Sequence, residues 1–126
     1  MVHRYVVKVA AWLEILTGAI VVVKPVIPCV LLFGAKPEGI GKPLAGMVGI
    51  ALLALGVACL PRKAAEVEPS AVRGLFVYNA GATTLLSWAA AFTTFHGFLL
   101  WPVIILHAFI AVALLLHLFS PRRPER

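Results

Sequence analysis

A glutamate inside an apolar run is the residue of this sequence with the clearest chemical potential. Glu14 lies within WLEILTG, residues 12–18, and the stretches on both sides are almost wholly apolar. A carboxyl group near the middle of a bilayer costs about 2.5–3.5 kcal/mol on insertion scales, so such residues have a structural or a functional use. Glu14 could make a hydrogen bond as a neutral acid, or it could bind a proton, a cation or a small ligand.

Further polar residues stand in the later apolar runs of the chain. Asn79, Thr83 and Ser87 recur every four residues, with Tyr78 beside them. Residues four apart lie on the same face of an α-helix, so this spacing predicts one polar stripe. The stripe supplies amide and hydroxyl groups that could bind Glu14.

Depth estimates suggest which of these polar groups can meet. A rise of about 1.5 Å per residue, counted from one end of each run, places Glu14 and Thr83 about 12 Å deep. The same count places Asn79 about 6 Å deep and His107 about 18 Å deep. The candidate intramembrane polar site is therefore Glu14, Asn79, Thr83 and His107, with Tyr78, Ser87 and Trp12 as secondary candidates.

Two interpretations of this site remain open from the sequence. In the structural one, Glu14 is a neutral acid that bonds to Asn79 or Thr83 and sets the helix register, because apolar surroundings favour the uncharged carboxyl. In the functional one, Glu14 lines a polar pocket, with Trp12 either in the pocket wall or facing lipid. Ionisable groups inside a membrane make the functional interpretation worth testing.

The histidines and cysteines give little support for a metal or a cofactor. His107 and His117 are ten residues apart, too far along one helix to bind the same metal ion. One of them could be an axial haem ligand, but no second ligand is specified. Cys29 and Cys59 form no CxxC pattern and are expected to be buried thiols. We expect no metal and no cofactor.

The composition places these residues in a membrane protein. Of 126 residues, 62% are hydrophobic and 13% are charged, and the mean hydropathy is +1.02. A soluble domain of this size could not bury so much apolar surface. The net charge of +6 comes from basic residues that flank the apolar runs, as topology signals do, so nucleic acid is not an expected partner.

Four apolar runs are long enough, or nearly so, to cross the hydrocarbon as helices. They cover residues 6–23, 44–60, 75–92 and 99–119, and we interpret the first as a retained helix rather than a signal peptide. Between the first two runs, residues 26–42 form a long outer connection whose apolar part, 26–33, is expected to be lipid-facing or re-entrant at the interface. The sequence thus predicts one all-α domain over residues 1–126, an integral membrane four-helix bundle.

Charge and small residues predict the orientation and the packing of this bundle. Eight of the eleven basic residues flank the termini and the middle connection, which favours cytoplasmic termini by the positive-inside rule.

Small residues at helical spacing allow close helix packing, within one chain rather than between copies. These packing candidates are Gly18, Ala45, Gly46, Gly49 and Gly56.

Four stretches together resemble the DoxX-like families, small bacterial four-helix membrane proteins. They are LEILTGAIVVVKP, LAGMVGIALLALGVACLP, VYNAGATTLL and LWPVIILHAFIAVALL. The resemblance implies a four-helix bundle without an established activity, and some such proteins are described as accessory subunits of membrane quinone-linked enzymes. The residues that carry the resemblance are Glu14 with Gly18, Gly46 with Gly49, Tyr78 with Asn79, and Trp101-Pro102 with His107.

Three functional hypotheses follow for a protein of the bacterial inner (plasma) membrane. The first is a non-enzymatic structural or accessory component, in contact with lipid and with copies of itself or another membrane subunit. The second is a small-molecule or ion binder or transporter that uses the site around Glu14. The third is a membrane redox or haem-associated protein. The chain has no phosphate-binding loop and little room for an enzyme domain outside the membrane, so we do not expect an enzyme.

Overall fold

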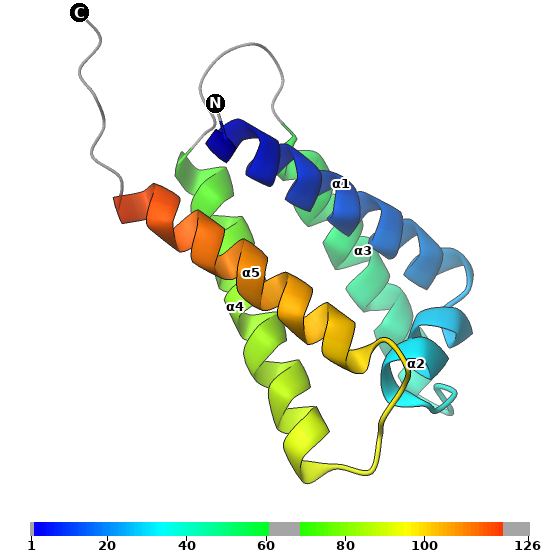
Figure 1. The fold of residues 1–126 in the computed structure, drawn as a ribbon. Helices are drawn as coiled ribbons and strands as arrows, with labels where there is room; N and C mark the ends of the chain where they lie inside the picture. The colour runs from blue at the N-terminus through cyan, green and yellow to red at the C-terminus, as the bar shows by residue number, and fades with distance from the viewer. Residues whose placement is uncertain (1, 61–68, 120–126) are drawn as a thin grey trace, which may run out of the picture.

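The protein is a bundle of helices in the computed structural model, which describes residues 2–60 and 69–119 (Figure 1). The helices are α1 (Val2–Val23), α2 (Val26–Phe33), α3 (Gly41–Cys59), α4 (Pro69–Phe92) and α5 (Leu100–Phe119), and the described residues contain no strand. All of these helices except the short α2 are long and apolar enough to cross a membrane. The prediction of an all-α chain with four candidate membrane spans is confirmed.

Prolines account for where the later helices begin. α3 begins at Gly41 and α4 at Pro69, earlier than the predicted residues 44 and 75. The N–H groups of a first helical turn have no acceptor within the helix, so proline is accepted there and polar residues can join the turn. Apolar runs therefore underestimate helix length. The first-turn prolines are Pro28, Pro43, Pro69 and Pro102.

The ends of α2 and α3 are also explained by the residues directly beside them. α2 ends at Gly34, whose φ of 68° is left-handed and whose N–H donates to the Val30 carbonyl at 2.9 Å. Glycine adopts this conformation without a steric penalty. Beyond α3, Leu60 is extended, with a ψ of 124°, as expected for a residue that precedes a proline.

The apolar stretch 26–33, expected to lie at the interface, is the helix α2, and its end is bound to the α4–α5 loop. The N–H of Gly97 donates to the Leu32 carbonyl at 2.9 Å, and the N–H of Leu99 donates to the Leu31 carbonyl at 2.8 Å. A Cβ atom at Gly97 would collide with the backbone of Leu31 and Leu32, which explains the glycine. α2 is thus part of the bundle, although Ile27 remains 45% exposed.

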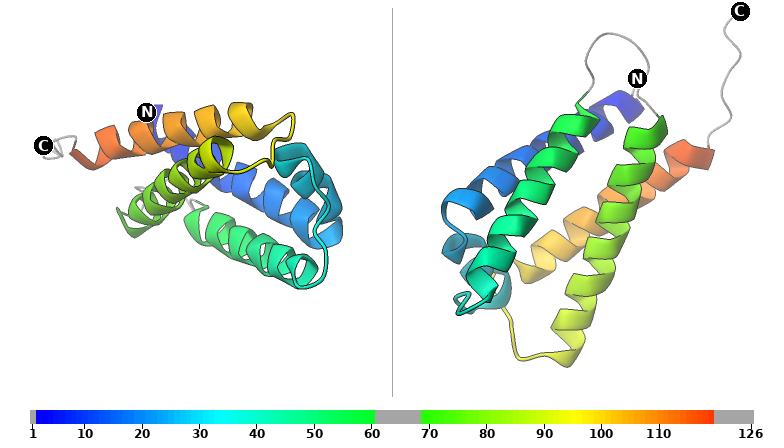
Figure 2. Two further views of the ribbon diagram at one scale, coloured as in Figure 1. Left: turned by 90° about the horizontal axis from the view of Figure 1, so that it is seen from below. Right: turned by 180° about the vertical axis from the view of Figure 1, so that it is seen from behind.

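The long helices are arranged as two pairs, α1 against α3 and α4 against α5, with fewer contacts between the pairs (Figures 1 and 2). The starts of α1 and α4 and the ends of α3 and α5 lie at one end of the bundle. α2 and the α4–α5 loop lie at the opposite end. The antiparallel α4–α5 hairpin expected from the short TTFHG turn is present.

Glycine allows the close approach of α1 and α3. A Cβ atom on Gly18 would lie 2.7 Å from the Gly49 carbonyl oxygen, and one on Gly56 would lie 2.6 Å from the Ala11 carbonyl oxygen. A larger residue at either position would push the two backbones apart. Gly46, another predicted packing position, is not a site of close approach, because a Cβ there would meet nothing within 4 Å. Gly46 points away from α1, and Ala45 is half-buried.

Two apolar clusters form the core. The first joins all four long helices and includes Val7, Ala10, Leu75 and Leu114. The second lies nearer the α4–α5 loop and consists of Leu86, Leu100 and Ile104. Along each of α4 and α5, the polar residues of interest fall between the residues of these two clusters.

Candidate functional site

Glu14 and Asn79 are the buried polar residues among the side chains that the structure describes. The exposed fraction is 3% for Glu14 and 0% for Asn79. Glu14 follows the residues of α1 that join the first apolar cluster, and Asn79 follows those of α4. The sequence therefore places both polar groups just beyond the main core, on helix faces that point inward.

Tyr78 joins α1 to α4 at this level. Its hydroxyl lies close enough to the Glu14 carboxyl to interact with it as a hydrogen-bond donor. The expected direct bond from Glu14 to Asn79 or Thr83 is not found among the described side chains, and Tyr78 takes that place. The phenol is long enough to reach across the gap between the two helix pairs, whereas the shorter Asn79 and Thr83 side chains bond within α4 and to α5.

Asn79 joins α4 to α5, and its bonds determine which way its amide faces. The Nδ2 group donates to the Leu75 carbonyl at 2.8 Å, so Oδ1 is turned to His107 Nδ1 at 2.7 Å. An amide oxygen can only accept, so Nδ1 carries the hydrogen of that bond. A neutral His107 therefore has its acceptor lone pair on Nε2.

A contact between two aromatic rings joins Tyr78 to His107. The Tyr78 and His107 rings meet edge to face, with centroids 5.7 Å apart and planes at 79°. Edge-to-face packing is a favourable arrangement for aromatic rings. Glu14, Tyr78, His107 and Asn79 are therefore connected across α1, α4 and α5, and we call these four residues the polar cluster.

The remaining predicted site residues lie at the margin of the polar cluster or outside it. Thr83 donates from Oγ1 to the Asn79 carbonyl at 2.8 Å, so it supports the cluster within α4. Ser87 is half-buried one turn further on. Trp12 is 47% exposed, and two residues along a helix separate it from Glu14 by roughly 200°. It belongs to the outer face of α1 and not to a wall around Glu14.

The starts of α1 and α4 differ from those that the depth estimate used. α1 begins at Val2 instead of residue 6, and α4 begins at Pro69 instead of residue 75. The two extra residues of α4 move Thr83 about 3 Å deeper relative to Glu14. Tyr78, five residues nearer the start of α4, then lies about 4.5 Å to the other side of the Glu14 level, a difference that its long side chain can span.

The other histidines and the cysteines stand apart from the polar cluster. His96 lies in the α4–α5 loop, where Nε2 is 2.9 Å from the Thr93 carbonyl oxygen. Cys29 in α2 and Cys59 at the end of α3 are free thiols, and Cys59 Sγ is 3.7 Å from the Ala71 carbonyl oxygen. Burial raises the pKa of the Cys29 thiol. Within the described residues, no three His, Cys, Asp or Glu side chains gather as a metal site.

No family model, curated protein or solved structure matches this chain. The polar cluster combines a carboxyl, a phenol, an imidazole and an amide in one connected set. Such a set can hold helices together through hydrogen bonds, and it contains groups that can also accept or release protons.

Proposed function

We propose that this chain is a non-enzymatic multi-pass protein of the inner (plasma) membrane that serves as a structural or accessory membrane component. The observation that supports this role is the polar cluster, whose members bond to each other across α1, α4 and α5. Buried polar groups that satisfy one another stabilise a unique arrangement of helices. The resemblance to DoxX-like proteins points in the same direction.

The proposed orientation has both termini in the cytoplasm. Lys8 and Arg73 lie toward the end of the bundle where α1 and α4 start, while Lys24, Lys36 and Lys42 lie toward the end that contains α2. The other basic side chains of the first group lie outside the described side chains, and they supply the excess that favours a cytoplasmic location. That group is Arg4, Arg62, Lys63, Arg122, Arg123 and Arg126.

Purification of the tagged full chain from its native membranes in a mild detergent tests the accessory role. We expect an assembly larger than the monomer, with a partner subunit or further copies in a fixed ratio. The Glu14→Gln variant should keep both the assembly and its thermal stability, because glutamine retains a neutral hydrogen-bonding side chain. A lone monomer contradicts the accessory role, and an unfolded Glu14→Gln protein contradicts the neutral acid.

A second candidate function is a proton- or cation-linked binder or transporter. Its specific support is that Glu14 is 3% exposed and that its bonding partner, Tyr78, is uncharged, so the carboxyl can gain or lose a proton without breaking an ion pair with that partner. Liposomes that contain the protein and an internal pH dye would report proton movement after an external pH jump. Equal rates for wild type and Glu14→Gln would remove this candidate.

A further inference from the structure

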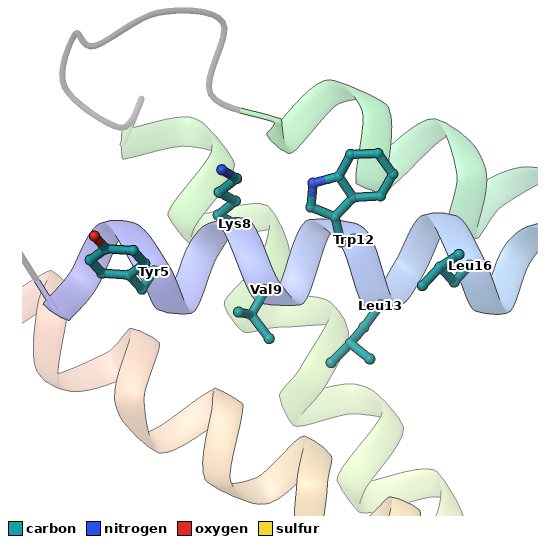
Figure 3. A pocket seen from close by; sticks show the side chains of 6 residues that line it. All are labelled: Tyr5, Lys8, Val9, Trp12, Leu13 and Leu16. Carbon is teal, nitrogen blue, oxygen red and sulfur yellow. The ribbon is translucent and has the colours of Figure 1, made fainter.

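The outer face of α1 carries a shallow groove that the polar cluster does not use (Figure 3). The residues that line it follow one another at helical spacing along the first three to four turns. Its volume is about 380 Å³, and its described lining is Tyr5, Lys8, Val9, Trp12, Leu13 and Leu16. We call this surface the α1 groove.

The polar atoms of the α1 groove lie toward one rim. Figure 3 shows the Lys8 side chain extending to the same side as the Trp12 indole, whose nitrogen edge is turned towards Lys8. The Tyr5 hydroxyl lies one turn nearer the start of the helix. An ammonium, an indole N–H and a phenolic O–H are all hydrogen-bond donors, so together they suit an anion with several acceptor oxygens.

The rest of the α1 groove is apolar and continues towards the middle of the candidate span. Val9 and Leu16 are 55% and 56% exposed, and Leu13 lies between them. These side chains suit a hydrocarbon chain that runs along α1. The groove therefore combines a cationic end near the start of the span with an apolar floor at greater depth.

The charge of Lys8 has no acidic partner among the described residues. The two acidic side chains described are Glu14, which is buried on another face of α1, and Glu38, which lies between α2 and α3 at the other end. Lys8 is the fourth residue of the candidate span that begins at Tyr5. A lysine at that depth extends its ammonium towards the lipid headgroups, where anionic lipids attract it.

We infer that the α1 groove binds one anionic phospholipid. The phosphodiester accepts hydrogen bonds from Lys8 and Trp12, with Tyr5 at its outer side, and an acyl chain lies over Val9, Leu13 and Leu16. This inference is independent of the role of the polar cluster, because it uses the opposite face of α1.

Trp12 lies in the α1 groove and serves as the reporter for a test. The chain contains Trp12, Trp88 and Trp101, so the double variant Trp88→Phe/Trp101→Phe keeps the groove tryptophan alone. This full-length variant is placed in liposomes that contain brominated phosphatidylglycerol or brominated phosphatidylcholine at equal mole fraction. Bromine on an acyl chain quenches a tryptophan that it touches, so the ratio of the two quenching curves gives lipid selectivity.

We expect phosphatidylglycerol to be preferred about fivefold, and Lys8→Gln to abolish the preference, because one lysine near an anionic surface contributes an attraction of that order. Lys8→Arg should preserve it. Lys42→Gln, a change of an exposed lysine at the other end of the bundle, should have no effect. A protein that keeps Trp88 alone, which is 54% exposed on α4, should show no preference.

Several results would overturn the inference. These are equal quenching of Trp12 by the two lipids, a preference that survives Lys8→Gln, or the same preference at Trp88. Suppression of the preference by millimolar inorganic phosphate would show a free-anion site and not a lipid site. Weak quenching by both lipids, together with crosslinks between cysteines placed at position 9 of two copies, would show that a second chain covers the groove.

Discussion

Tyr78 adds a polar contact between the two helix pairs to the apolar cluster that joins them. It reaches Glu14 on α1 through its hydroxyl and His107 on α5 through its ring. A single side chain therefore takes part in both a polar and an aromatic contact between helices. Loss of its hydroxyl should leave the ring contact in place and remove the partner of a buried acid.

Tyr78→Phe should lower the free energy of unfolding by about 1–2 kcal/mol, the range for hydrogen bonds between membrane helices. Reversible unfolding in mixed detergent micelles would measure it. Tyr5→Phe is the matched control, because Tyr5 is 66% exposed and lies on the outer face of α1. If both variants are equally stable, the Tyr78 hydroxyl does not stabilise the bundle.

Asn79 and His107 should show energetic coupling. Their 2.7 Å hydrogen bond joins α4 to α5 within a partly buried site. A double-mutant cycle with Asn79→Ala and His107→Ala should give a coupling free energy of about 1 kcal/mol. The pair Ser87→Ala and His117→Ala, whose members lie toward opposite ends of the α4–α5 hairpin, serves as the control cycle. Additive effects of Asn79→Ala and His107→Ala would argue against the bond.

For single residues, the sequence indicates which polar side chains are buried better than it indicates their hydrogen-bond partners. A glutamate within an apolar run and an asparagine in a polar stripe were sufficient to select Glu14 and Asn79 as buried groups. Their bonds could not be predicted, because the side chain that reaches Glu14 depends on the exact helix starts and on side-chain length, and residue spacing specifies neither. Lys8 and Tyr5 resemble ordinary flanking residues of a first span, so the sequence does not mark them as candidate lipid-binding residues.

Among the elements, α1 and α3 form the interface with the closest backbone approach. Their glycines face each other's backbone, while Gly46 on the same helix faces open space. The difference between two glycines three residues apart gives a stringent test of this interface.

Gly49→Ala should destabilise the protein by about 1–3 kcal/mol, because its Cβ would lie 2.9 Å from the Val22 backbone nitrogen and helix α1 would have to move. Gly46→Ala should be neutral or stabilising by up to about 1 kcal/mol, because alanine has a higher helix propensity. Thermal unfolding of the two variants in the same detergent makes the comparison. Equal losses of stability would place α3 in a different rotation about its axis.

The four long helices were largely predictable from hydropathy and from the prolines beside the apolar runs. Four apolar runs and their neighbouring prolines are sufficient to locate four long helices. Apolar runs place the starts of α3 and α4 too late, because residues in the first two turns, such as Ser70 and Arg73, are polar and add nothing to an apolar run. The binding of α2 to the α4–α5 loop was not predictable, because it consists of backbone hydrogen bonds between segments distant in sequence.

For the whole molecule, Cys29 offers a test of the proposed orientation. It is a half-buried thiol in α2, whereas Cys59 is 5% exposed near the other end of the bundle. A membrane-impermeant maleimide should label Cys29 in right-side-out vesicles and should not label a Cys29→Ser variant. Labelling of Cys29 confined to inverted vesicles would reverse the proposed topology.

The pH dependence of that labelling follows from the raised pKa of Cys29, which burial causes. The thiolate is the reactive form, so a raised pKa means less thiolate at neutral pH. The labelling rate should therefore keep rising at pH values above about 8.5, where an ordinary cysteine is already half ionised. A plateau below that pH would mean that Cys29 is more accessible to water than in this structure.

The pairing of helices also has a consequence for how the protein is made. Glu14 enters the membrane with the first span, and Tyr78 follows only after α3 and the start of α4 have been synthesised. Until then the carboxyl lacks Tyr78, and the remaining apolar residues of α1 must outweigh its cost of about 2.5–3.5 kcal/mol at the translocon. The α1–α3 pair can form during this interval through its glycines. The arrival of α4 and α5 then completes the contacts of Glu14, so the last spans to be synthesised stabilise the first.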